Sequence, residues 1–239
     1  MGNRGKALIR TSITVSAVLS LAACTGDTGE AERDKPSTVV SASTAAAAEP
    51  MDRLTNRLVG LTDLQGRPLY IVPEARTRSH LEALTNQPLF ERVYTPADCA
   101  PDEAFTPPPA GLEGVLGRSN LSDDHSGLGV EIHTAPNEAE LVDYFVGAGP
   151  EPLVRCTDFE VTVGDVRQGF SYTRVDAPPI APHSRVTQYS VTQDGSTTHP
   201  LRVTAVDGLL AASVILSTVE PADEGTTDRI LRLTQQAVS

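Results

Sequence analysis

The chain has 239 residues, a formal net charge of −12 and no tryptophan, with hydrophobic residues at 39% and aromatic residues at 4%. An excess of negative charge repels polyanions, so no nucleic-acid partner is expected. Because aromatic side chains are few, the core of a single domain has to be built from Val, Leu, Ile and Ala.

Residues 1–24 resemble the lipobox signal of bacterial lipoproteins. A basic start precedes the apolar stretch Ile13–Leu21, which is too short to span a bilayer and ends in Ala22-Ala23-Cys24. The resemblance implies cleavage before Cys24 and diacylation of its sulfur with palmitate-type chains. Two such chains suffice for stable attachment to the outer side of the cytoplasmic membrane. The alternative is an ordinary secretory signal with an incidental cysteine.

Three regions follow from these boundaries. Residues 1–23 are predicted to be the signal peptide. Residues 24–50 are predicted to be a disordered tether, because they have almost no large apolar side chain to bury. Residues 51–239 are predicted to form a single extracytoplasmic domain, in which 51–94 is the least regular part and a candidate N-terminal extension.

Two cysteines remain once Cys24 carries lipid. In an oxidising compartment this even remainder predicts a disulfide between Cys99 and Cys156, the alternative being a pair of buried free thiols. Two cysteines alone make a weak zinc site, and the five histidines show no ligand spacing. We therefore expect no metal ion and no cofactor.

Between residues 51 and 111 the pattern is irregular. Short apolar runs at 59–64 and 69–72, separated by Gln65-Gly66-Arg67-Pro68, predict two extended segments joined by a turn. A helical turn is expected at 79–84. Prolines are too frequent at 96–111 for a helix or a central strand, so this stretch is predicted to be a surface loop held by Cys99.

From residue 127 the pattern becomes regular. Val130 and Ile132 alternate with polar neighbours, which predicts a half-buried strand. A helix is expected to begin at Pro136 and to end at the glycines before Pro150, with acidic residues in its first turn. One face of this helix comprises Leu141, Tyr144, Phe145 and Ala148.

The remaining chain predicts several strands and a final helix. Alternating apolar residues indicate strands at 159–163, 170–173, 187–191 and 201–205. Asp194-Gly195 is typical of a hairpin turn, and the apolar run Leu209–Leu216 predicts a central strand covered on both faces. A helix near 222–238 would pack Ile230, Leu233 and Ala237 on the sheet.

The order of these elements predicts an α+β fold. It comprises an antiparallel sheet of about five strands, with helices on one face and the other face open, preceded by the signal peptide and the disordered tether.

Several of these features together resemble actinobacterial, largely mycobacterial, lipoproteins related to the extracellular sensor domain of receptor serine/threonine kinases. The features are the lipobox at Cys24, the Pro-Ala-Asp-Cys segment at 96–99, the helix that leads to Cys156, the following sheet and the terminal helix. The match spans residues 90–239. It implies a disulfide-linked α+β domain outside the cell with a cleft for a small ligand. Because the chain has no kinase segment, a stand-alone binding or adaptor role is expected.

The loop at 177–184 is the strongest candidate site, because its prolines stiffen a connection between two predicted strands. Pro178, Pro179 and His183 are its candidate ligand-binding residues. The alternative is a rigid surface connection without a function.

A second candidate joins Asp123-Asp124-His125 with Glu131 and His133. Their carboxylates and imidazoles would make a metal site or an acid–base pair only if the side chains converge. A solvated turn followed by the outer face of a strand is the simpler interpretation.

The sequence contains no nucleophile elbow, His-Glu-x-x-His, Cys-x-x-Cys or phosphate-loop motif, so no catalytic residue is assigned and an enzyme is not expected. The leading interpretation is a cell-surface lipoprotein whose sensor-like domain binds a small ligand or an envelope protein. Two alternatives stay open. A lipid or glycolipid carrier needs a large apolar cavity, and an envelope hydrolase needs a nucleophile beside His133, His183 or His199.

Overall fold

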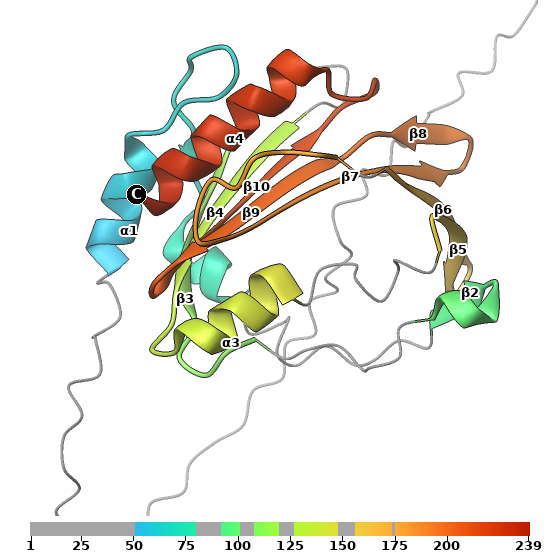
Figure 1. The fold of residues 1–239 in the computed structure, drawn as a ribbon, viewed down its shortest axis with the longest axis horizontal. Coiled ribbons are helices and arrows are strands. Elements are labelled where there is room, and N and C mark those ends of the chain that lie inside the picture. Colours follow the sequence, from blue (N-terminus) through green and yellow to red (C-terminus); the bar gives the residue numbers. More distant parts are fainter. Residues whose placement is uncertain (1–50, 80–91, 101–107, 120–126, 148–155, 174) are drawn as a thin grey trace, which may run out of the picture. The chain divides into compact units, whose positions relative to one another are not determined.

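One antiparallel sheet is the framework of the fold in the computed structural model (Figure 1). The structure describes residues 51–79, 92–100, 108–119, 127–147, 156–173 and 175–239, all within the unit Val40–Ser239. The predicted signal peptide, Cys24 and the tether lie outside the described residues. No helix in the described part of the chain is long and apolar enough to cross a membrane.

The sheet has ten strands, and every pairing between them that the structure describes is antiparallel. The strand order is β1-β3-β4-β10-β9-β7-β6-β5-β2, and β8 pairs with β7. The strands are β1 (Tyr70–Ile71), β2 (Arg92–Thr95), β3 (Glu113–Arg118), β4 (Gly127–Thr134), β5 (Asp158–Val163), β6 (Val166–Thr173), β7 (His183–Gln193), β8 (Ser196–Thr198), β9 (Leu201–Asp207) and β10 (Leu210–Ser217).

The predicted α+β class is confirmed, but the expected number of strands is wrong. The strands predicted at 159–163, 170–173, 187–191, 201–205 and 209–216 are present as parts of β5, β6, β7, β9 and β10. The sequence pattern missed β2, β3 and β8. The first two lie beside a stretch rich in glycine and proline, and β8 has only three residues.

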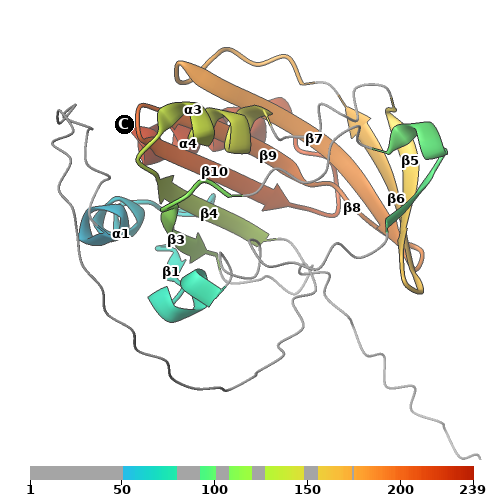
Figure 2. The same ribbon diagram turned by 90° about the horizontal axis from the view of Figure 1, so that it is seen from below.

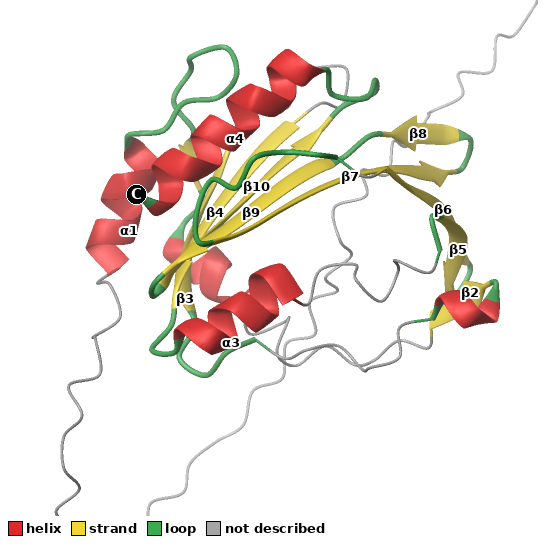
Figure 3. Ribbon diagram, viewed as in Figure 1, coloured by secondary structure: helices red, strands yellow, loops and turns green. Residues whose placement is uncertain are grey.

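Helices lie on both faces of the sheet, not on one as predicted (Figures 1, 2 and 3). The larger core cluster joins α1 (Met51–Val59) and α4 (Glu224–Val238) to the sheet. A smaller cluster lies under α3 (Glu138–Val142) and the π-helical turn η2 (Asp143–Gly147). Val206 and Ala211 belong to the smaller cluster while their neighbours Ala205 and Ala212 belong to the larger. Because side chains alternate along a strand, the two clusters are on opposite faces.

The terminal helix α4 forms as its sequence predicts. Asp223 caps its N-terminus by accepting a hydrogen bond from the Thr226 N–H at 2.7 Å. Ile230, Leu233 and Ala237 are buried on its inner face. The helix packs on β9 and β10, the strands at the centre of the sheet.

Residues 51–59 form a helix that the sequence pattern missed, so Val59 is not extended as predicted. The rest of the predicted arrangement is present in part, because Thr62 pairs with Pro68 in an antiparallel bridge around the predicted turn. Leu54 and Leu58 are fully buried one turn apart, whereas the Val59 side chain is 63% exposed. The α1 helix contacts β3, and Arg57 donates a hydrogen bond to the Ser239 carbonyl at 2.6 Å. This hydrogen bond joins α1 to the end of α4.

The predictions for the extended segment at 69–72, the helical turn at 79–84 and the hairpin at Asp194-Gly195 are confirmed only in part. Tyr70–Ile71 is extended as predicted, and residues 74–79 are helical, ahead of the helical turn predicted at 79–84, most of which lies outside the described residues. Asp194-Gly195 makes the predicted hairpin turn, with φ values of 51° and 77°. It joins β7 to β8, whereas the sequence pattern had β9 as the second strand.

The disulfide expected from the cysteine count is present. Cys99 ends the short 3₁₀ helix η1 (Ala97–Cys99) after β2, and Cys156 lies just before β5. The bond therefore fastens edge strand β2 to its neighbour. The two cysteines are 57 residues apart, and closing such a loop restricts the unfolded chain by about 4 kcal/mol in the loop-entropy account.

Candidate ligand-binding site on strands β5 to β7

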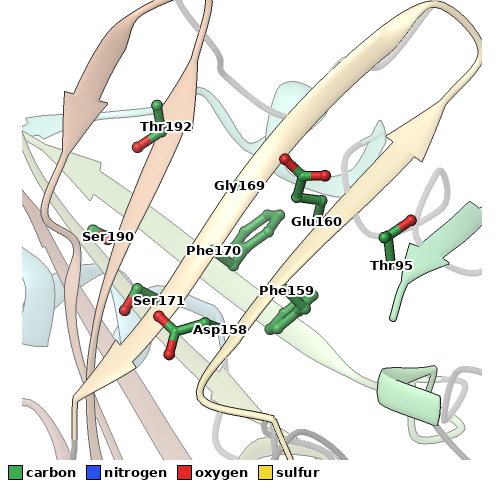
Figure 4. Close-up of a pocket in the computed structure, with 9 residues that line it drawn as sticks. All are labelled: Thr95, Asp158, Phe159, Glu160, Gly169, Phe170, Ser171, Ser190 and Thr192. Carbon is green, nitrogen blue, oxygen red and sulfur yellow. The ribbon is translucent and has the colours of Figure 1, made fainter. Parts of the chain in front are cut away.

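An open depression lies on the α4-side face of the sheet, over β5, β6 and β7 (Figure 4). Val186 of β7 packs into the larger core, so Ser190 and Thr192, at even spacing from it, point to the same face. Helix α4 packs on β9 and β10, and Figures 1 and 2 show β5 and β6 beyond its end. This end of the face is therefore the part of the sheet that the helix leaves open.

Two rows of polar residues cross the strands at this place. The first row runs through directly paired residues Thr95, Glu160, Gly169, Thr192 and Thr197 on β2, β5, β6, β7 and β8. The second row, two residues along, pairs Asp158 with Ser171 and Ser171 with Ser190. Hydrogen-bonded strands lie about 4.8 Å apart and residues two apart on a strand lie about 6.8 Å apart. The rows thus form a regular array of hydroxyl and carboxyl groups.

Gly169 makes the hollow in this array. It lies between Glu160 and Thr192 in the first row and has no side chain to fill the space between them. A Cβ atom at Gly169 would come no closer than 3.9 Å to another heavy atom, which is ordinary van der Waals contact. The cavity volume is about 410 Å³. This volume is within the range of about 300 to 1,000 Å³ for small-ligand sites.

Asp158 is a permanently charged acceptor at one end of the site. Hydrogen bonds from the Ser171 and Thr157 hydroxyls lower the pKa of its carboxyl group below the ordinary value. The Thr157 hydroxyl donates to Oδ2 at 2.9 Å. A carboxylate has about four lone-pair positions, so acceptor capacity remains for a ligand. Figure 4 shows Asp158 and Ser171 pointing toward one another.

Other polar contacts hold the rest of the array in place. Glu160 forms an ion pair with Arg167, which comes from the neighbouring strand β6. The hydroxyl groups of Thr192 and Thr197 lie 3.0 Å apart and share a hydrogen bond. These contacts position the carboxylate of Glu160 and the hydroxyl of Thr192 on opposite sides of Gly169.

Stacked aromatic rings support the floor of the depression from the other face. Phe159 and Phe170 alternate with the polar residues of their strands, and their ring centroids are 5.2 Å apart with nearly parallel planes. Tyr172 continues the stack at 5.8 Å from Phe159, and Tyr189 follows at 5.1 Å from Tyr172. An aromatic row therefore stabilises the strands at this end of the sheet.

The predicted loop site lies elsewhere. Pro178, Pro179 and His183 are exposed, whereas Ala177, Ile180 and Ala181 pack against the larger core. The loop is thus anchored on the α4 side of the sheet, and its three candidate residues line no part of the depression.

The second predicted cluster is brought together only in part. His133 is 5% exposed, and its Nε2 lies 3.5 Å from Oε2 of Glu131. Its ring contacts Phe145 at a centroid distance of 4.9 Å, and its buried Nδ1 has no hydrogen-bond partner among the described residues. Asp123-Asp124-His125 lies outside the described residues.

Metal-ligand geometry is confined to one group. Among the described residues, the one set of three candidate ligand groups that converge is Asp98, Cys99 and Cys156. Its two sulfurs are joined in the disulfide, so this set does not provide thiolate ligands.

Sequence analysis did not single out the residues of the depression. Asp158, Glu160 and Ser171 were recognisable as the polar partners of apolar residues in predicted strands. Their convergence depends on which strands pair and in which register, and alternation within one strand does not reveal this. The signal that could have drawn attention to them is the repeated carboxyl or hydroxyl residue at every second position of β5.

The fold and the depression define the folded part of the chain as a disulfide-linked α+β domain with an open polar surface site. No protein-family model and no curated protein matches the chain. Solved structures similar to it include the extracellular domain of PknH from Mycobacterium tuberculosis, at 13% identity and a TM-score of 0.49, covering 79% of this chain and 96% of that one. Another is an uncharacterised protein from Mycobacterium smegmatis, the Rv0999 ortholog, at 17% identity and a TM-score of 0.40, covering 71% of this chain and 83% of that one. At these TM-scores neither likeness defines the fold or the function of this chain.

Proposed function

We propose that this protein is a lipid-anchored, extracytoplasmic binding protein, and that its folded domain holds a small polar ligand in the depression over β5 to β7. The observation that carries the location is the disulfide between Cys99 and Cys156, because such bonds persist in oxidising compartments outside the cytoplasm. The lipobox ending at Cys24 supports the same location from the sequence.

The chemistry of the depression favours binding over transport of lipid. A carrier for acyl chains needs a large enclosed apolar cavity, whereas this depression is open, and Asp158, Glu160 and several hydroxyl groups line it together with Phe159 and Phe170. Such groups recognise ligands through hydrogen bonds. A ligand held there stays in contact with solvent and is accessible to other envelope components.

The anchor is tested by replacing Cys24 with Ala in the full chain expressed in an actinobacterial host. We expect the native protein to incorporate radiolabelled palmitate and to partition into the detergent phase, and Cys24→Ala to do neither. Thr25→Ala is the matched control, because it changes the next residue and leaves the lipidated cysteine in place. Equal labelling and partitioning of Cys24→Ala and the native protein would contradict the anchor.

The binding role is tested by native mass spectrometry of the full protein extracted from the envelope in mild detergent. We expect a mass in excess of the lipidated chain that disappears on denaturation. Filling the depression by Gly169→Val should remove that excess mass, since a Cβ atom at Gly169 comes no closer than 3.9 Å to another heavy atom and the larger side chain projects into the hollow. An excess mass that persists in Gly169→Val would place the ligand elsewhere, and no excess mass in either protein would argue against a retained small ligand.

A further inference from the structure

We propose that the ligand of the β5 to β7 depression is a saccharide, neutral or amine-bearing, recognised through the two cross-strand rows of polar side chains. The inference rests on the proposed binding function and names the ligand class for the same site. It starts from the composition of the rows, which offer two carboxylates and the hydroxyls of four Ser and Thr residues: Asp158, Glu160, Thr95, Ser171, Ser190 and Thr192.

A surface with two carboxylates and four hydroxyls can form hydrogen bonds with the hydroxyl groups of a sugar. Each sugar hydroxyl both donates and accepts a hydrogen bond, so it can donate to a carboxylate and accept from a Ser or Thr side chain. A hydrogen bond to an ionised carboxylate is stronger than one between neutral groups. Hydroxyl donors lower the pKa of the Asp158 carboxyl group, which further favours its ionised form. The site is thus supplied with strong acceptors for a ligand that has many donors.

The spacing of the rows also suits a ring-shaped polar ligand. Within the first row, Glu160 and Thr192 lie on either side of the gap at Gly169, each about 4.8 Å away along the row, and the second row runs about 6.8 Å from it. The carboxylate of Asp158 lies in one row and that of Glu160 in the other. A sugar ring lying over Gly169 would have hydroxyl groups directed to both rows, while the backbone of the glycine allows close approach.

Other ligand classes fit these residues less well. A divalent cation is favoured where several acidic side chains converge, and among the described residues no converging set of three His, Cys, Asp or Glu side chains includes Asp158 or Glu160. An anion would meet the carboxylates of Asp158 and Glu160, of which Arg167 pairs with the second alone, on a chain with a net charge of −12. An apolar ligand would leave the hydroxyls and carboxylates of the array desolvated without partners. A saccharide with no negative charge avoids all three penalties.

The test measures binding of the full detergent-solubilised protein to an array of immobilised neutral, amine-bearing and anionic oligosaccharides. We expect retention on members of the first two groups and not on the anionic group. Gly169→Val should abolish this binding, because its side chain fills the central gap. Gly129→Val is the matched control: Gly129 lies in strand β4, has open space at its Cβ position and does not line the depression.

A second variant keeps the shape of the site. Asp158→Asn replaces the charged acceptor by a neutral amide of the same size, and we expect about a tenfold loss of affinity for the same oligosaccharide. Circular dichroism of each variant checks that the fold is retained.

The outcomes separate the ligand class from the binding function. Absence of oligosaccharide binding, retention only of anionic members, or binding that Gly169→Val leaves intact would overturn the saccharide proposal. If native mass spectrometry nevertheless detects a different ligand that is lost from Gly169→Val, the saccharide proposal fails while the proposed binding function stands.

Discussion

At the scale of single residues, Asp63 organises the turn between α1 and β1. Its side chain is buried, and its Oδ1 accepts hydrogen bonds from the backbone N–H groups of Gln65 and Arg67, both at 2.9 Å. Its Oδ2 accepts from Nε of Arg67 at 2.8 Å. Burial acts to raise the pKa of Asp63, but these hydrogen bonds outweigh it and hold the pKa below its ordinary value. One carboxylate thus satisfies the polar groups of the turn.

Replacing Asp63 by Ala should destabilise the fold. The change leaves two backbone N–H groups without their acceptor, and we expect the free energy of unfolding to fall by about 1 to 3 kcal/mol. Urea denaturation followed by circular dichroism measures it. Glu74→Ala is the control, because Glu74 pairs with Arg78 in an exposed i,i+4 ion pair that contributes at most about 0.5 kcal/mol. Equal effects of the two substitutions would contradict the role given to Asp63.

The charge of Asp63 adds a pH dependence with a definite sign. Since the pKa is lowered on folding, the charged form contributes stability above the ordinary value of 3.8. That contribution is lost as the pH falls through the lower pKa of the folded state. Asp63→Asn keeps one acceptor oxygen and loses the charge, so its deficit relative to the native protein should be constant near neutral pH and shrink in acid. A deficit that grows in acid would show the opposite sign.

At the scale of elements, α1 docks on β3 because Gly117 has no side chain. A Cβ atom at Gly117 would lie 2.9 Å from Cδ1 of Leu58, whose side chain is fully buried. The same close approach sets the distance between the helix and the sheet. Leu58 therefore enters the larger core through a gap that only glycine leaves open.

We expect Gly117→Ala to destabilise the domain by about 1 to 3 kcal/mol, because the added methyl group overpacks the contact with Leu58. Chemical denaturation measures the change, and Gly129→Ala on the adjacent strand β4 should have little effect, since nothing lies near its Cβ position. Leu58→Ala in the Gly117→Ala background should cost less than the sum of the two single changes. Additive costs would mean that Leu58 and Gly117 do not compete for the same space.

These glycines also explain which elements the sequence could predict. Strand β10 and helix α4 carry their own apolar patterns, and both were predicted within a few residues. In β3, Gly114 and Gly117 resemble turn residues, but each is required by a side chain from another element: His133 lies over the first and Leu58 over the second. A glycine that is required by a side chain from another element produces no periodic pattern in the sequence of its own strand. The depression has the same origin, because its residues meet only through the pairing of β5, β6 and β7.

At the scale of the whole molecule, the two ends of the sheet are stabilised by different means. One end is covered by α1 and α4 on one face and by α3 on the other. The other end has the aromatic row, in which Tyr172 stacks between Phe159 and Tyr189. Burial raises the pKa of Tyr172, with a further contribution from the neighbouring Tyr189, and burial also raises the pKa of Tyr189.

This difference predicts how the molecule unfolds in alkali. The raised pKa values mean that Tyr172 and Tyr189 keep their protons in the folded state, whereas in the unfolded chain they ionise near the ordinary value of 10.0. Stability is therefore fully present below about pH 10 and falls as the pH rises above it. Tyr172→Phe keeps the stacked ring and removes the hydroxyl that ionises, so its alkaline unfolding midpoint should lie at higher pH than that of the native protein. Tyr70→Phe, at a side chain that is 56% exposed, is the control and should leave the midpoint unchanged.

Circular dichroism reports unfolding and tyrosinate absorbance reports ionisation. The part of the tyrosinate absorbance that Tyr172→Phe removes should appear together with unfolding in the native protein, because this hydroxyl ionises only when the aromatic row opens. Ionisation of all tyrosines well before unfolding would mean that the row does not shield them.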